Sequence, residues 1–287
     1  MIMEKKEKSG FRRTLEKFMK NPTAVFGVVI ILVMFIMAIF AGQIATHDPL
    51  EINPGERLMA PGPEHWFGTD RMGRDVYSRV VYGSRISLIV GFSVVLLTSL
   101  FGTFLGLVSG YFRKLDEIIM RILDGLMAFP GLILMIMIMA VLGRSLINVI
   151  ITLAIVYTPR MARVVRGAVL VQKEQTYVEA ARAIGASHFR ILFSHIARNC
   201  IAPIIIQGTM IFAYVVLAES ALSFLGVGMP PETPSWGVVI SSGKVFLRRA
   251  PWICLFSGVA ISLCVLALNS IGDGLRDVLD PRLKRKG

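Results

Sequence analysis

The sequence predicts an all-α polytopic membrane protein with six transmembrane helices. Of its 287 residues, 54% are hydrophobic and 17% are charged, whereas a soluble domain has about 45–50% and about 25%. The hydrophobic residues gather into blocks, and several blocks reach the roughly 20 residues that a helix needs to cross the hydrocarbon core. Charged or Pro/Gly-rich segments separate the blocks. This patterning excludes an ordinary soluble protein.

Six blocks are predicted to span the membrane: residues 24–44, 84–111, 118–142, 146–161, 201–225 and 252–271. They divide the chain into a cytoplasmic N-terminal segment (1–23), a first transmembrane helix (24–44), an external loop (45–83), a five-helix core (84–272) with a cytoplasmic loop at 167–200, and a cytoplasmic tail (273–287).

The first block follows a basic segment and the dipeptide Asn21-Pro22. A basic segment before an apolar run also describes a signal peptide. This run is longer than the 7–15 residues, roughly, of a signal's apolar region. We therefore expect an uncleaved first span.

The second block carries Gly102, Gly106 and Gly110, one every four residues. This spacing places three positions without side chains on one face of a helix, where a neighbouring helix can approach closely. We expect this face to pack against another span.

The third block contains Asp124 near its inner end and Pro130 further on. Proline removes a backbone donor, so we expect a kinked span, with the freed carbonyl satisfied by neighbouring helices. The fourth block carries Pro159 and ends in basic residues.

Lysine and arginine are distributed unevenly between the two sides. With both termini inside, the inner segments carry far more of them than the outer ones, which the positive-inside rule reads as cytoplasmic termini. The membrane topology therefore explains most of the formal net charge of +12, and no nucleic-acid partner is expected.

Cysteine and histidine form no recognisable site pattern. Cys200, Cys254 and Cys264 show no paired spacing and are expected to be small buried hydrophobes. His188 and His195 lie seven residues apart without a third ligand, so no metal site is expected.

The largest cytoplasmic segment is predicted to form two short amphipathic helices. In the first, Tyr177, Ala180, Ala181 and Ile184 share one face, and Gly185 suits a left-handed helix end. Ser187 can cap the second helix, in which four apolar residues repeat the spacing: Phe189, Leu192, Phe193 and Ile196. The segment resembles a DNA-reading helix–turn–helix, but it is tethered between two spans. A docking surface for a soluble partner is the preferred interpretation, with a purely structural loop as the alternative.

The residues "EAARAIGA" (179–186) resemble the EAA loop of membrane permeases in ABC importers. The resemblance implies that this loop couples the spans to a cytoplasmic ATPase, through Glu179, Ala180, Ala181, Gly185, Ala186 and Ser187. The family pattern continues with Leu-Pro where this chain has Ala197-Arg198, which leaves open whether the second helix ends there or runs on to Pro203.

Further stretches resemble one branch of that family, the second permease subunit of dipeptide, oligopeptide, glutathione and nickel importers: "NPTAVFG", "HWFGTDRMGRDVYSRVVYGSRISL", "AESALSFLGVG" and "GDGLRDVLDPRLK". The resemblance covers essentially the whole chain. It implies a six-span type I ABC importer permease fold in a bacterial inner membrane. It also implies a related permease subunit, two ATPase subunits and an external binding protein as partners, together with membrane lipid.

The external segment around Asp70, Arg74 and Asp75 has two interpretations. Thr69 or Asp70 can cap a helix, and Asp75 has opposite charges four residues away on each side. The segment is either a well-capped helix at the outer surface or part of the surface where a binding protein docks.

The chain contains no G-x-x-x-x-G-K-[ST] motif, so it is not expected to be an enzyme, and ATP and Mg²⁺ are expected on the partner ATPases. The rival hypothesis is an ion-coupled transporter or channel, which usually places several ionisable groups within its spans. Glu219 is the one clear case, with Asp124 nearer an end. Glu219 either lines the pathway or is held by Ser220, Ser223 or a partner helix, and the structural role is slightly favoured. The cargo is not chosen by the sequence, although short peptides are the commonest for this resemblance.

Overall fold

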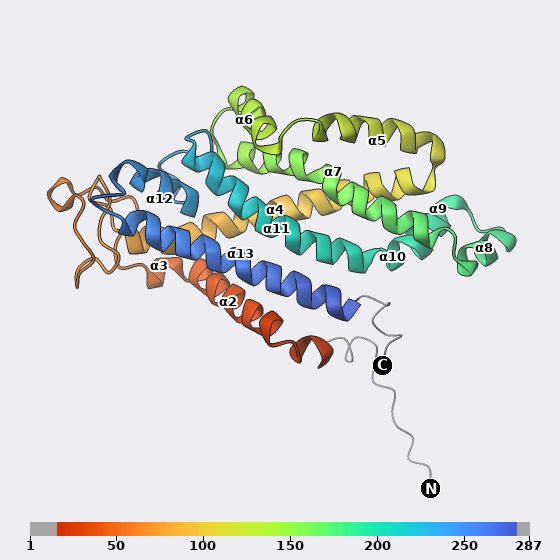
Figure 1. The fold of residues 1–287 in the computed structure, drawn as a ribbon, viewed down its shortest axis with the longest axis horizontal. Coiled ribbons are helices and arrows are strands. Elements are labelled where there is room, and N and C mark those ends of the chain that lie inside the picture. The colour runs from red at the N-terminus through yellow and green to blue at the C-terminus, as the bar shows by residue number, and fades with distance from the viewer. Residues whose placement is uncertain (1–15, 280–287) are drawn as a thin grey trace, which may run out of the picture.

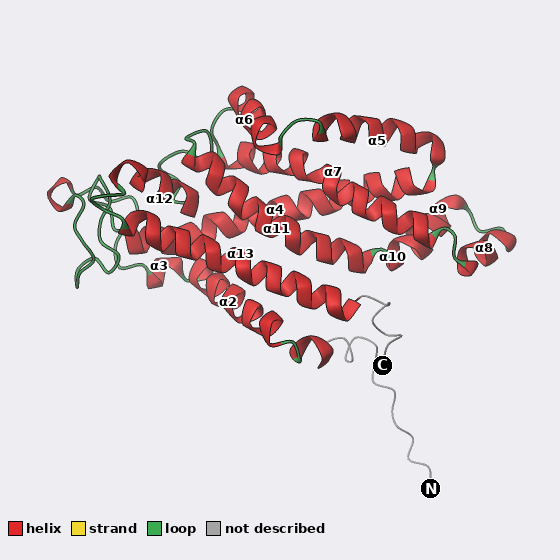
Figure 2. Cartoon of the chain, in the orientation of Figure 1, coloured by secondary structure: helices red, strands yellow, loops and turns green. Residues whose placement is uncertain are grey.

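The computed structural model describes residues 16–279. The first fifteen residues of the predicted N-terminal segment and residues 280–287 of the predicted tail lie outside this range. Within it the chain is helical apart from connecting loops and one isolated antiparallel bridge between Thr69 and Asp75 (Figure 2). The long helices run side by side along the long axis of the molecule (Figure 1).

Five described helices are long and apolar enough to cross a membrane: α2 (Pro22–Ile39), α4 (Val76–Tyr111), α7 (Leu146–Gln172), α11 (Ile201–Phe224) and α13 (Trp252–Leu279). Two more, α5 (Arg113–Met127) and α6 (Gly131–Leu142), pass the same test only as a pair. The shorter elements are α3 (Ala41–Ile44), η1 (Pro54–Glu56), α8 (Thr176–Ala183), α9 (His188–Arg190), the π-helical η2 (Ile191–Ile196), α10 (Ala197–Asn199), α12 (Trp236–Gly243) and η3 (Lys244–Phe246). The predicted all-α, multi-span architecture is confirmed.

The third predicted span is not one kinked helix. The axes of α5 and α6 differ by 89°, and Pro130 precedes the first residue of α6 with an extended ψ of 125°. Proline has no backbone N–H to continue the ladder, and it disfavours helical geometry in the residue before it. The expectation of one kinked helix from 118 to 142 is therefore wrong, because the chain forms two separate helices that meet at a sharp turn.

Three other predicted boundaries are wrong, because in each case the helix is longer than expected. Helix α4 begins at Val76 rather than at 84, with Asp75 as its N-cap, so the loop expected at 45–83 ends eight residues earlier. Helix α7 runs through Pro159 to Gln172, so the loop expected to start at 167 starts at 173. The sixth span also continues to Leu279, which makes residues 273–279 helical rather than part of a tail.

The glycine face of α4 packs on α7. A Cβ atom added at Gly102 would lie 2.6 Å from Cβ of Met161, and one at Gly106 would lie 2.6 Å from the carbonyl oxygen of Ala162. At Gly110 it would lie 2.7 Å from Cβ of Val169. The contacts advance in the same direction along both helices, so α4 and α7 run parallel, and the three glycines let them approach more closely than any side chain would allow.

The buried residues form two clusters. One joins α4, α7 and α11 to the 173–200 segment, and the other joins α2, α4, α12 and α13. Helix α4 contributes to both clusters and thus links the two halves of the bundle.

Candidate functional site

The segment between α7 and α11, residues 173–200, extends beyond the spans at one end of the molecule (Figure 1). The loop of residues 45–75 and helix α12 lie at the opposite end. The two polar regions singled out in the sequence are thus separated by the full length of the bundle.

The first helix of this segment, which the resemblance to the EAA loop marks as the expected coupling segment, ends at the predicted glycine. Helix α8 stops at Ala183, and Gly185 has a φ of +80°, a left-handed conformation that glycine adopts without steric cost. The amide of Ala186 then donates to the carbonyl of Ala181 at 3.0 Å, which satisfies a carbonyl at the helix end. Ser187 Oγ accepts from the amide of Arg190 at 3.4 Å and caps the second helix.

The second helix continues past the Ala197-Arg198 pair. Helix α9, the π-helical η2 and α10 follow one another without a gap from His188 to Asn199. Cys200 separates α10 from α11, and Pro203 lies in the first turn of α11, where its missing N–H is tolerated. The helix end left open in the sequence is therefore at Cys200.

The buried faces of these helices differ from the predicted ones. In α8, Val178 and Ala181 are buried, whereas Ile184 is 85% exposed. The second helix buries Ile191, Leu192 and Ile196. Its Phe189 and Phe193 are exposed and stack on each other, with ring centroids 6.4 Å apart. The π-helical turn shifts the register of the helix faces, so the period of 3.6 residues did not identify the inner side correctly.

Side-chain hydrogen bonds tie the coupling segment to α4 and α7 and link its own two helices. The hydroxyl of Tyr111, the last residue of α4, lies 2.8 Å from Nδ1 of His188. Tyr177 donates to Oε1 of Gln172 in α7 at 2.9 Å, and Asn199 donates to the Tyr177 hydroxyl at 3.1 Å. Glu179 lies on the exposed side of α8. The segment is therefore anchored on its inner side and free on its outer side.

Glu219 is buried in α11, facing the start of α12. Its Oε1 accepts hydrogen bonds from Ser223 at 2.8 Å and from Ser235 at 2.7 Å. Ser220 instead donates to the carbonyl of Val216. Of the two residues proposed to hold this carboxyl, Ser223 does and Ser220 does not. Ser235, which the sequence did not suggest, is the second donor.

Asp124 lies in α5 and is paired with a basic residue. It forms an ion pair of 2.6 Å with Arg163 of α7, and both side chains are about half exposed. A second α5–α7 pair joins Asp116 and Arg166 through two hydrogen bonds of 2.6 Å. Both carboxylates join α5 to α7.

Asp70 and Arg74 are buried at the loop end of α4. Asp70 Oδ2 accepts from Nε of Arg74 at 2.8 Å and lies 3.8 Å from Nε of Arg79. The Asp70 Oδ1 atom accepts from the amides of Met72 and Arg74. Arg79 is fully buried and donates to the carbonyl of Pro49 at 3.1 Å. These residues fold the loop onto α4.

Asp75 is the N-cap of α4, a role proposed for Thr69 or Asp70. Its Oδ2 accepts from the amide of Ser78 at 2.7 Å, and its Oδ1 lies 2.8 Å from Nδ1 of His65. Nε2 of His65 lies 3.2 Å from Oε2 of Glu56. Burial lowers the pKa of His65, but its hydrogen bonds to the two carboxylates outweigh burial and raise it above its ordinary value.

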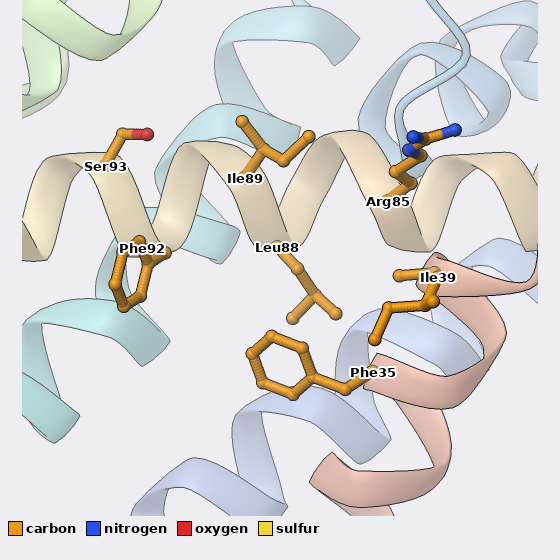
Figure 3. Close-up of a pocket in the computed structure, with 8 residues that line it drawn as sticks. Phe35, Ile39, Arg85, Leu88, Ile89, Phe92 and Ser93 are labelled. Atoms are coloured by element: carbon orange, nitrogen blue, oxygen red, sulfur yellow. The ribbon is translucent and has the colours of Figure 1, made fainter.

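A shallow apolar crevice of about 480 Å³ runs between α2 and α4. Figure 3 shows Phe35 of α2 and Leu88 of α4 pointing toward each other across it. Ile39, Ile89 and Phe92 extend this lining, and Arg85 lies at one end (Figure 3). Its lining suits a lipid chain or apolar side chains of a neighbouring helix.

Comparison with known proteins decides the family. Residues 99–285 match the model of the binding-protein-dependent transport system inner membrane component. Residues 9–61 match the N-terminal transmembrane domain of oligopeptide transport permease C. The chain belongs to this permease family.

Curated relatives match the permease over nearly its whole length. It is 46% identical to the dipeptide transport system permease protein DppC of Alkalihalophilus pseudofirmus, over 96% of this chain and 91% of the relative. It is 41% identical to DppC of Haemophilus influenzae, over 93% of each chain. It is 39% identical to the glutathione transport system permease protein GsiD of Pectobacterium atrosepticum, over 99% of this chain and 95% of that one.

The fold of the permease also matches a solved structure. A chain of the MetNI methionine ABC transporter in inward-facing conformations aligns with a TM-score of 0.59 and 19% identity, over 70% of this chain and 96% of that one. This likeness concerns the fold, which is that of a type I importer permease. A multi-pass membrane protein that moves solutes with partner proteins is the function class that follows from the family.

The permease contains a polar cluster that sequence analysis missed. His47, His65 and Asp75 each offer a ligand atom, and these three atoms lie within 4.8 Å of one another. Their separations along the chain match no known metal motif. Only the folding of residues 45–75 onto the start of α4 brings them together.

Proposed function

We propose that this chain forms half of the translocation pathway of an ATP-driven importer of short peptides. It would pair with a related permease subunit, receive cargo from an external binding protein and be driven by two cytoplasmic ATPase subunits. The names of its relatives support the cargo class, since several are dipeptide or peptide permeases. ATP and Mg²⁺ would bind to the ATPase subunits, because this sequence has no phosphate-binding loop.

The observation that carries this proposal is the two-sided character of the coupling segment. Its outer side exposes Ile184 and Phe189, which are 85% and 69% accessible, at the far end from α12. An apolar side chain that protrudes beyond the spans is best explained by a protein that covers it. The neighbouring Glu179 and Arg182 are exposed as well and supply polar contacts around these apolar anchors.

The inner side of the same segment provides the mechanical link. Val178, Ile191 and Ile196 belong to the buried cluster that includes Met161 and Val165 of α7. Because packed interiors transmit displacement rather than absorb it, a partner that pulls on α8 also moves α7. Helix α7 packs closely on the glycine face of α4, so the motion reaches two spans together. We infer that closure of the ATPases opens the pathway toward the binding protein in this way.

The proposed orientation places both termini and the coupling segment in the cytoplasm. The supporting observation is the concentration of Lys and Arg at that end and in the terminal segments. Residues 45–75 and helix α12 would then face the binding protein.

An ion-coupled transporter is the weaker candidate. Such a protein needs an ionisable group that the pathway can reach, but Glu219 is buried and engaged by Ser223 and Ser235. This arrangement suits a structural carboxyl.

Uptake by reconstituted proteoliposomes tests the proposal. The full complex, prepared with its ATPases and binding protein, is expected to accumulate a radiolabelled dipeptide only when ATP and the binding protein are both present. Uptake driven by an ion gradient without ATPase subunits would support the transporter hypothesis instead. Competition by unlabelled dipeptides, glutathione and nickel salts would identify the cargo class. If neither peptides nor glutathione reduced uptake of the labelled dipeptide, the peptide assignment would be overturned.

A further inference from the structure

We propose that His47, His65 and Asp75 form a binding site for a divalent transition-metal ion such as Zn²⁺. The site lies where the 45–75 loop meets the first turn of α4, at the end of the molecule opposite the coupling segment. It is independent of the importer function proposed above.

The spacing of the three ligand atoms suits a tetrahedral ion. Asp75 Oδ1 lies 2.8 Å from Nδ1 of His65 and 3.9 Å from Nδ1 of His47. Ligands about 2.0–2.1 Å from Zn²⁺ lie about 3.3 Å from each other in a tetrahedral site. The two observed distances bracket this value, and all three atoms lie within 4.8 Å of one another, so coordination requires the exposed His47 side chain to move closer to the other two.

The outer hydrogen bonds are those that metal-bound ligands require. A metal-bound histidine usually donates its second ring N–H to a carboxylate, and Nε2 of His65 lies 3.2 Å from Oε2 of Glu56. The second oxygen of Asp75 is held by the amide of Ser78 at 2.7 Å. The orientations of His65 and Asp75 are thus fixed from behind, and their inner atoms face each other.

This geometry already accommodates a positive charge. His65 has a carboxylate oxygen within hydrogen-bond distance of each ring nitrogen, whereas a neutral imidazole has only one N–H. Both contacts are favourable when the ring carries a proton on each nitrogen, or a metal ion on Nδ1 and a proton on Nε2. A metal ion that displaces the Nδ1 proton preserves this balance and adds His47 as a ligand.

The surroundings would attract a cation and leave it accessible. His65 and Asp75 are buried, whereas His47 is on the open side. They line a cavity of about 370 Å³ with four further carboxylates: Asp48, Glu51, Glu56 and Glu64. None of the described residues that line it is Lys or Arg. A cleft lined by one sign of charge raises the local concentration of counter-ions, and the open side leaves room for a water ligand.

The mixed ligand set distinguishes transition metals from calcium and magnesium. Imidazole nitrogen suits Zn²⁺, Co²⁺ or Ni²⁺, whereas Ca²⁺ and Mg²⁺ prefer oxygen ligands. A bound ion would connect the loop, through His47 and His65, to the N-cap of α4. The expected consequence is a more rigid loop at this end of the molecule.

Equilibrium dialysis of the untagged full-length chain in detergent, after treatment with a chelator, tests the proposal. We expect one Zn²⁺ per chain, little displacement by excess Ca²⁺, and tetrahedral visible absorption when Co²⁺ replaces Zn²⁺. His47→Asn should abolish this stoichiometric binding, and the fold should tolerate it because His47 is partly exposed and its ring is hydrogen-bonded to the neighbouring Thr46. Glu56→Gln should weaken Zn²⁺ about 10–100-fold.

His195→Asn is the matched control, since His195 is exposed at the other end of the molecule, and this variant should bind Zn²⁺ like the unaltered chain. The proposal is overturned if the unaltered chain binds no stoichiometric Zn²⁺. It is also overturned if His47→Asn binds Zn²⁺ as tightly as the unaltered chain, or if Ca²⁺ competes at equal concentration.

Discussion

The hydroxyl of Ser235, the N-cap of α12, donates a 2.7 Å hydrogen bond to Oε1 of Glu219 in α11. The same hydroxyl accepts from the amide of Val238 at 3.2 Å. One buried carboxyl thus joins the first turn of a short helix to the interior of a span. The hydrogen bond thereby links α11 to α12 across the connecting segment 225–235.

Glu219→Ala is expected to destabilise the protein by about 1–3 kcal/mol, because it leaves two buried serine hydroxyls without their acceptor. Glu219→Gln keeps an acceptor oxygen and is expected to be milder. Thermal unfolding in detergent measures both effects. Folded Glu219→Gln protein should still transport. Loss of transport in this variant would indicate that the charge of Glu219 is needed in the translocation pathway.

Gly106→Ala is expected to destabilise the protein by about 1–3 kcal/mol, the usual cost of overpacking. The added Cβ would lie 2.6 Å from the Ala162 carbonyl and 2.7 Å from Cβ of Val165. Gly167→Ala is the matched control in the facing helix α7, because nothing lies within 4 Å of its added Cβ. This control should gain up to about 1 kcal/mol from helix propensity. Equal melting temperatures for the two variants would contradict the close α4–α7 packing.

Asp70→Asn is expected to destabilise the protein by about 3–5 kcal/mol, since it leaves the buried guanidinium of Arg79 without its opposite charge. Arg79 has no exposed surface and lies 3.8 Å from Asp70. Arg71→Ala, one residue away and exposed, should change stability by less than about 0.5 kcal/mol. Chemical unfolding monitored by tryptophan fluorescence compares the two, and similar losses would refute the structural role of Asp70.

The spans were predictable because hydrophobic length reports directly on membrane crossing. The start of α4 was not, because Arg79 makes residues 76–83 look polar. Its charge is compensated by Asp70 and by the carbonyl of Pro49, thirty residues away. A hydropathy profile contains no information about partners so distant in the sequence. The 89° turn at Pro130 is likewise a tertiary outcome, since the same residue can kink a helix or end it.

The coupling segment shows the same division between local and tertiary signals. Its glycine turn and its Ser187 cap are local features and were predictable from the residue types. The outward position of Phe189 was not, because the π-helical turn that follows it has no sequence signature. The His47–His65–Asp75 cluster was missed for a related reason, as its members meet only when the loop folds onto α4.

Residues 173–200 are proposed to transmit the work of partner ATPases to the spans. The most direct measurement is the ratio of peptide taken up to ATP hydrolysed in proteoliposomes that carry the Glu179→Ala/Gly185→Ala variant. Alanine at Gly185 is strained by its positive φ but clashes with nothing. Gly226→Ala is the matched control, with a φ of +81°, open surroundings and a place at the opposite end of α11. The variant is predicted to insert normally and to lose at least about tenfold in this ratio, equivalent to about 1.4 kcal/mol, while the control keeps it. An unchanged ratio in the correctly inserted variant would contradict the claim.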